Sequence, residues 1–161
     1  MTHSRYSSVL LLSAALFLPV HLFAQSVTNL SNELLYGTWV LDLQRSVFIE
    51  REAPKSQSMI FEPDADGLRV TIIITNKNNI EEKISYIDKQ NGEPARLSGS
   101  TNFDTIVLES RDPYHTASIF THAGMEVGRS QRTISLNGQE MMVEVERKGN
   151  LSSRSVFLKQ K

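Results

Sequence analysis

The sequence predicts an all-β protein whose antiparallel strands form an up-and-down barrel of about ten strands. Polar and apolar residues alternate in run after run, which is the period of a half-buried strand, and no helical period is sustained after residue 36. Turn dipeptides of the kind that form tight hairpins separate the runs, namely Asp66-Gly67, Asn91-Gly92 and Asn137-Gly138. Closing such a meander into a barrel removes its exposed edges. A sandwich of two sheets has a similar sequence signature and is the alternative.

The first 24 residues have the character of a secretory signal peptide. Arg5 and the α-amino group provide a positive start, and an apolar run of 12 residues extends from Val9 to Val20. As a helix this run is about 18 Å long, too short for a hydrocarbon core of roughly 30 Å. Small residues around Ala24 offer a cleavage site. We therefore expect a signal peptide at 1–24, a barrel domain at 25–161, a secreted or periplasmic location, and no stable membrane anchor.

The body of the chain is divided into ten predicted strands, preceded by one possible helical turn near 32–36. The clearest alternation places Met141, Val143 and Val145 on one face. A similar apolar row is formed by Leu68, Val70, Ile72 and Ile74. The predicted strands lie near 36–44, 56–62, 68–75, 80–88, 95–98, 105–110, 115–121, 125–136, 139–148 and 152–159. The connections are uniformly short, so the chain is expected to form one domain.

Composition limits the possible functions of the chain. Its 161 residues contain no Cys, which excludes a disulfide framework, a thiolate metal site and a cysteine nucleophile. The 17 basic and 18 acidic residues give a net charge of -1, so no electrostatic basis for nucleic-acid binding exists. We predict no nucleic-acid partner, and the sequence does not indicate the oligomeric state.

The predicted first strand carries the motif Gly37-Thr38-Trp39. This strand resembles the opening strand of the calycins, the lipocalins and fatty-acid-binding proteins, and most of the mature chain more closely resembles secreted bacterial lipocalin-like domains. The resemblance implies an indole that plugs the closed end of a barrel. In lipocalins an arginine from a late strand lies across this indole, and Arg154 is the candidate here.

Two features depart from the fatty-acid-binding proteins. Residues 45–55 are too few to hold the helical lid that those proteins insert between their first two strands. Their last strand carries an Arg-x-Tyr pair that binds a ligand carboxylate, whereas Ser155 and Phe157 occupy the corresponding positions here. With no fixed charge there, we expect neutral apolar ligands to bind more tightly than fatty acids of equal length.

The inward faces of the strands supply the candidate ligand site. Small-molecule sites are mainly apolar with a few placed polar groups, although the same side chains could simply fill the barrel. The predicted ligand-binding residues are Trp39, Met59, Phe61, Val70, Ile72, Ile84, Tyr86, Leu108, Arg129, Met141, Val143 and Phe157. Tyr86 adds a hydroxyl, and the two methionines adapt to varied shapes.

The strand near 125–136 has two possible registers. Its row of Val127, Arg129, Gln131 and Thr133 would supply polar anchors if it faced inward. If that row faced outward, Ile134 and Leu136 would join the core instead. Alternation alone does not choose between these registers, and an inward Arg129 would reverse the expected preference for neutral ligands.

The sequence offers little support for catalysis. His115 and His122 are seven residues apart, which places them on opposite faces of an unbroken strand. Asp112 and His115 could form a triad with a serine on paper, but no Gly-x-Ser-x-Gly elbow is present. We therefore predict no catalytic residue, no metal site and no cofactor.

Three functional hypotheses follow in order of preference. The first is a non-enzymatic barrel that binds a small apolar or amphipathic molecule. The second is a filled barrel that binds a protein or surface partner through its loops, especially 45–55 and 111–114. The third is an enzyme with catalytic groups at the barrel mouth, which a buried acid–histidine pair facing a cavity would support.

Export can be tested on the protein recovered from outside the cytoplasm. The charged start and short apolar run predict cleavage near Ala24, so N-terminal sequencing should begin close to Gln25 or Ser26. Soluble exported material that still carries residues 1–24 would contradict the prediction.

Overall fold

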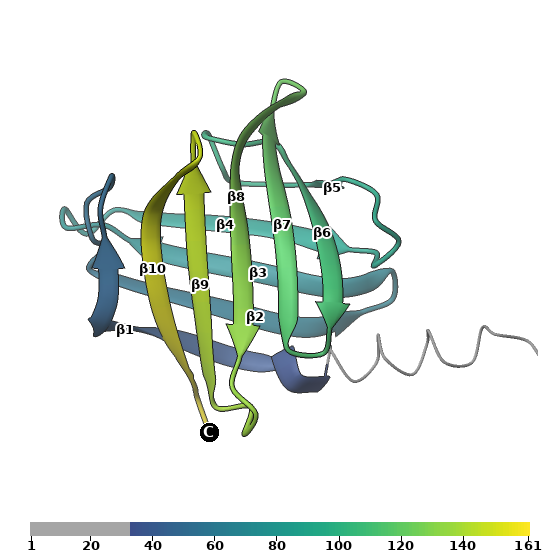
Figure 1. Cartoon of the computed structure of the whole chain (residues 1–161), viewed down its shortest axis with the longest axis horizontal. Helices are drawn as coiled ribbons and strands as arrows, with labels where there is room; N and C mark the ends of the chain where they lie inside the picture. The colour runs from purple at the N-terminus through teal and green to yellow at the C-terminus, as the bar shows by residue number, and fades with distance from the viewer. Residues whose placement is uncertain (1–32) are drawn as a thin grey trace, which may run out of the picture.

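The computed structural model describes residues 33–161, with the side chains of Ser110 and Arg111 excepted, and the predicted signal peptide lies outside this range. The described chain forms one antiparallel sheet curled into a nearly closed barrel, which confirms the predicted fold class (Figure 1). Its strands are β1 (Gly37–Phe48), β2 (Ser56–Asp64), β3 (Gly67–Thr75), β4 (Glu81–Asp88), β5 (Ala95–Arg96), β6 (Thr105–Asp112), β7 (His115–His122), β8 (Met125–Ile134), β9 (Glu140–Arg147) and β10 (Asn150–Lys159).

The strand order is that of a meander joined through its two ends. The sheet runs β4-β3-β2-β1-β10-β9-β8-β7-β6-β5, so the first and last strands pair and every other neighbour follows in sequence. Strands β2, β3 and β4 cross behind β6–β10 and form the opposite wall (Figure 1). Each half of the chain therefore supplies one wall of the barrel.

The barrel closes where the segment after β5 meets β4. Ser85 and Ser98 exchange two backbone hydrogen bonds of 2.9 Å across this seam. Gly99 follows with a φ of 85°, and a Cβ built there would lie 1.9 Å from the carbonyl oxygen of Lys83. Only glycine fits this close approach between the two backbones.

The end of the barrel that contains Trp39, called the base below, is filled with closely packed side chains. Its largest fully buried side chains are Trp39, Phe61, Phe157, Leu68, Met141 and Val70. The indole N–H of Trp39 donates to the carbonyl oxygen of Leu35, 2.7 Å away, in a helical turn at 33–35. This turn, which the sequence predicted near 32–36, covers the barrel base.

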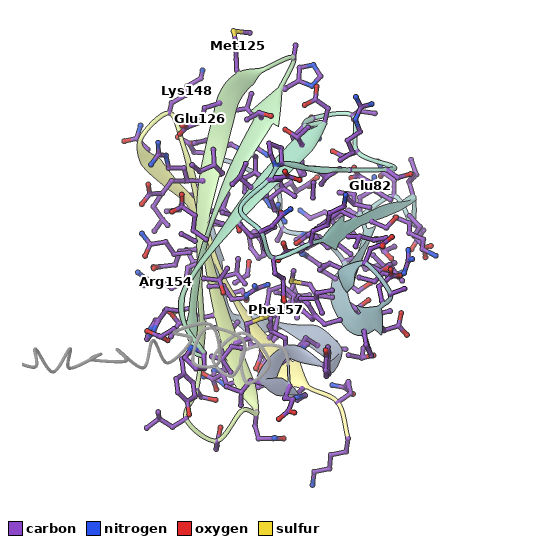
Figure 2. The ribbon with its side chains drawn as sticks, turned by 90° about the vertical axis from the view of Figure 1, so that its right-hand side faces the viewer. Glu82, Met125, Glu126, Lys148, Arg154 and Phe157 are labelled. Atoms are coloured by element: carbon purple, nitrogen blue, oxygen red, sulfur yellow. The ribbon has the colours of Figure 1, made fainter. Side chains whose placement is uncertain are left out.

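The cation beside the indole is Lys159, and the prediction of Arg154 for this place is wrong. Lys159 and Trp39 are paired across β10 and β1, which brings the ammonium nitrogen to 5.2 Å from the ring centroid. That nitrogen also donates to the carbonyl oxygen of Leu34 at 2.9 Å. Arg154 lies on the outside of the sheet and binds Glu144, whereas Phe157 lies inside the barrel (Figure 2).

Two further differences concern the strand ends. β1 extends beyond its predicted end to Phe48, because a bulge between Asp42 and Val47 bends the strand and lets it continue along β10. In the register where Arg129 faces outward, the sequence placed both Ile134 and Leu136 in the core; Ile134 is buried, but Leu136 is 85% exposed. It lies in the turn after β8, where strand alternation no longer determines which side chains are buried.

Within residues 33–161, no helix combines the length and the apolar character that a membrane crossing requires.

The base can be tested by truncating its indole. Trp39 is fully buried and hydrogen-bonded, so Trp39→Ala should lower the free energy of unfolding by about 3–5 kcal/mol. Leu136→Ala, at an exposed turn position, is the control and should change it by less than about 0.5 kcal/mol. Urea denaturation measures both, and equal effects would contradict the proposed plug.

Candidate functional site

A cavity of about 120 Å³ lies inside the barrel above its solid base. This volume is below the usual range of roughly 300–1,000 Å³ for drug-sized ligands. It is close to that of engineered apolar cavities of about 150 Å³ that hold a benzene molecule. The cavity therefore fits a compact ligand of about the size of a substituted benzene ring.

The wall formed by β2, β3 and β4 is mostly apolar, with Gln57 and Tyr86 as its polar residues. Met59, Ile72 and Ile84 are paired in one row across these three strands, and all three line the cavity. Ile74 continues the apolar surface one inward position further along β3. This wall can bury the flat apolar part of a ligand.

The opposite wall is polar. Ser118 and Ser130 are directly paired across β7 and β8, and β10 adds Ser153 and Ser155. Each of the four is at most 8% exposed and lines the cavity. Among the described residues, none of these side-chain hydroxyls has a hydrogen-bond partner within the protein. They are thus available to water or to a ligand.

Arg132 is the charged group of this wall. It follows Ser130 by one inward step on β8, is 8% exposed, and lies with its guanidinium carbon 5.2 Å from the centroid of the Phe61 ring. Its Nε has no hydrogen-bond partner, and within residues 33–161 the guanidinium makes no ion pair. Burial lowers the pKa of Arg132, but a guanidinium stays protonated at neutral pH. The cavity wall therefore contains a protonated guanidinium that has no direct ion pair among residues 33–161.

Two titratable neighbours influence this charge. Burial raises the pKa of Tyr86 to about 12, so its phenol is protonated at neutral pH and can donate a hydrogen bond. Burial also raises the pKa of Asp88, while a backbone hydrogen bond from Gln90 and the charge of Arg132 act in the opposite direction. Neither group forms a direct ion pair with Arg132.

Further polar groups line the cavity beyond the serines. Arg51, from the segment after β1, lies with its guanidinium carbon 5.2 Å from the centroid of the Phe48 ring. Burial lowers the pKa of Arg51, the charge of Arg147 lowers it further, and Glu82 opposes both. The side-chain oxygen of Gln57 is also buried without a partner.

The structure separates the predicted ligand-binding residues into three groups. Those that line the cavity are Met59, Ile72, Ile84, Tyr86, Val143 and Phe157. Those that pack in the core without lining it are Trp39, Phe61, Val70, Leu108 and Met141. Arg129 belongs to neither group, because it lies on the outer face of β8 and binds both carboxylate oxygens of Glu126 at 2.6 and 2.9 Å.

The register of β8 explains both Arg129 and the residues that the sequence analysis missed. Ile134 pairs with Met141 and Arg132 with Val143, so the even-numbered residues of β8 share the inward face of β9. The predicted hairpin at Asn137-Gly138, combined with the clear inward row of β9, contained this information. Cross-strand partners share a face, and that rule assigns Arg132 to the interior.

The Asp112–His115 pair lies at the turn between β6 and β7, away from the cavity. The histidine Nδ1 is 2.8 and 2.9 Å from the two carboxylate oxygens, and both side chains are about half exposed. The backbone N–H of Tyr114 and the side chain of His115 lower the pKa of Asp112. The Nδ1 atom of His122 lies 3.9 Å from the carboxylate oxygen Oδ2 of Asp104. Among residues 33–161, no three His, Asp or Glu side chains gather as a metal site would require.

Comparison with known proteins adds no relative, since no family model and no curated protein matches this sequence. The calycin resemblance of the Gly37-Thr38-Trp39 strand therefore stays a prediction.

A stability measurement can distinguish a structural Arg132 from a functional one. A buried, unpaired cation costs free energy, so Arg132→Met should leave the free energy of unfolding unchanged or raise it by roughly 1 kcal/mol. Arg129→Met, on the outer face of the same strand, is the matched control and should change it by about 0.5 kcal/mol or less. A loss above about 2 kcal/mol on Arg132→Met alone would show that Arg132 stabilises the fold.

Proposed function

We propose that this chain is a non-enzymatic binding protein that takes a small amphipathic anion into its barrel. The observation that carries the proposal is Arg132, a buried and unpaired cation in the wall of an otherwise largely apolar cavity. The anionic group binds at Arg132, and the apolar part lies against the row of Met59, Ile72 and Ile84.

The energetics favour an anion over a neutral ligand of the same shape. Moving a carboxylate out of water is costly unless charged and hydrogen-bonding partners replace the water. Arg132 supplies the charge, and the hydroxyl of Ser155, which lines the same cavity, is a further donor. Hydrogen bonds between charged groups are roughly twice as strong as neutral ones. This reverses the sequence-based expectation, which considered Arg129 as the only cation that could enter the interior.

The size of the cavity favours compact acids. A volume of about 120 Å³ suits a single ring or a short chain. We also propose that binding takes place outside the cytoplasm, because the first 24 residues resemble a signal peptide, although they lie outside the described part of the chain.

One observation favours the alternative of an interaction module. Val47 and Ile49, within the segment 45–55 that the sequence analysis singled out, are 52% and 59% exposed. Exposed apolar side chains of this kind can contact a protein partner. Failure of every small acid to bind would favour this alternative.

The role of Arg132 is tested by comparing benzoate with benzamide, which has nearly the same shape and no charge. Because hydrogen bonds to charged groups contribute about 1.5–3 kcal/mol, benzoate should bind about tenfold to a hundredfold more tightly at neutral pH. Arg132→Gln should remove this difference, and Arg129→Gln should preserve it, since Arg129 lies outside the cavity. Isothermal titration calorimetry measures the affinities.

Equal affinities of benzoate and benzamide for the unmodified protein would contradict the anion site. A preference that survives in the folded Arg132→Gln variant would assign the anion to another residue. Absence of binding by either compound would contradict the proposed function itself.

A further inference from the structure

Three of the cavity serines lie at one level of the polar wall. Ser118 pairs with Ser130, Ser130 pairs with Val145, and Val145 pairs with Ser153, so the three hydroxyl-bearing residues lie in one row across β7 to β10. We call Ser118, Ser130 and Ser153 the serine row. It lies further from the solid base than Arg132, because Ile134, the next inward residue of β8, packs in the core with Met141.

The spacing between the serine row and Arg132 is set by the strand. Ser130 and Arg132 are successive inward residues of β8, and a strand rises about 3.4 Å per residue, which gives roughly 7 Å between them. The same step separates Ser153 from Ser155 on β10. The wall thus presents a charged level and, roughly 7 Å further out, a neutral hydrogen-bonding level.

The serine row is not explained by the packing of the barrel. Its members are 8%, 7% and 1% exposed, and all three line the cavity. A buried hydroxyl costs free energy unless it is hydrogen-bonded, and Ala or Val would pack there without that cost. On the opposite wall, Met59, Ile72, Ile74 and Ile84 show the apolar solution, although Gln57 and Tyr86 line the cavity there too. Arg132, over nine-tenths buried and unpartnered, independently points to a ligand in the same cavity.

We infer that the ligand is a compact hydroxylated acid, whose carboxylate binds Arg132 and whose hydroxyl group, on the far side of a flat apolar body, binds the serine row. This inference rests on the proposed function and names its ligand class. A serine hydroxyl both donates and accepts, so it can satisfy a ligand hydroxyl in either role. The row carries no charge, and a neutral polar group therefore suits it better than a second ion.

A para-hydroxylated aromatic acid is the smallest probe with this arrangement. In 4-hydroxybenzoate the two polar groups lie on opposite ends of one ring, which suits an anion-binding level and a hydroxyl-binding level whose Cα atoms on β8 are roughly 7 Å apart. The ring itself fits the cavity of about 120 Å³ and contacts the apolar wall. A methyl group in place of the hydroxyl keeps the size and removes the hydrogen bonds.

The experiment measures the affinities of 4-hydroxybenzoate, 4-methylbenzoate and benzoate for the mature protein by isothermal titration calorimetry. Sites built to hydrogen-bond a ligand hydroxyl strongly reject analogues that lack it, because their own polar groups are then left unpaired. We expect 4-hydroxybenzoate to bind at least tenfold more tightly than 4-methylbenzoate. The double variant Ser130→Ala, Ser153→Ala should bring this ratio close to one. Gln131→Ala, an exposed position beside Ser130 on β8, is the control and should keep it.

The outcomes separate the inference from the proposed function. Equal or tighter binding of 4-methylbenzoate, with benzoate still preferred over benzamide, would overturn the hydroxyl site and leave the anion site intact. A preference for 4-hydroxybenzoate that survives in the folded double variant would also overturn it. Absence of binding by all three acids would overturn both proposals, and a thermal melt of each variant establishes that it is folded.

Discussion

The rest of the barrel depends on the packing around the Trp39 indole. Trp39 pairs with Met59 on β2 and with Lys159 on β10, so it lies where the first and last strands of the chain join. Its N–H bonds the turn that covers the base, and its ring packs in a layer with Phe61 and Phe157. Since this layer is solid, the upper interior need not supply the main hydrophobic stabilisation and can contain a cavity with polar walls.

Arg132 and the serine row occupy this upper part of the interior, where the stability of the barrel does not require apolar side chains. In a filled barrel, each of these positions would be more stable with an apolar side chain. Instead, Arg132 lies over the ring of Phe61, and Tyr86 and Asp88 interact with its charge through space, with no direct ion pair among residues 33–161. Polar groups held without partners in a rigid scaffold are already oriented for a ligand, which lowers the cost of binding. On the proposed function, the interior gives up some stability in exchange for ligand recognition.

The sequence predicted the ten strands and their order well because most of them alternate clearly between polar and apolar residues. It predicted the candidate site only in part, and β8 is the reason. One row of this strand contains Val127 and Arg129, and the other contains Gly128, Ser130 and Arg132, so neither row is recognisably apolar. Pairing with β9 decides the register, and a strand read in isolation lacks that information. Lys159 escaped notice for a similar reason, since its neighbour Trp39 is 120 residues away in the chain.

The chemical asymmetry of the cavity follows from the topology of the meander. In this barrel the strands of the first half of the chain form one wall and those of the second half form the other (Figure 1). The first half contributes the apolar row of Met59, Ile72 and Ile84 together with Arg51, Gln57 and Tyr86, and the second half contributes the serines and Arg132 among apolar neighbours such as Val143 and Val145. A division along the sequence thus becomes a division across the cavity. Such walls fix two aspects of how a ligand lies: which of its ends is near Arg132, and which of its faces contacts each wall. Turning its apolar face toward the serines would leave buried polar groups unpaired. Substitutions in β2–β4 therefore act on the affinity for the apolar body, and those in β7–β10 act on the choice of polar groups.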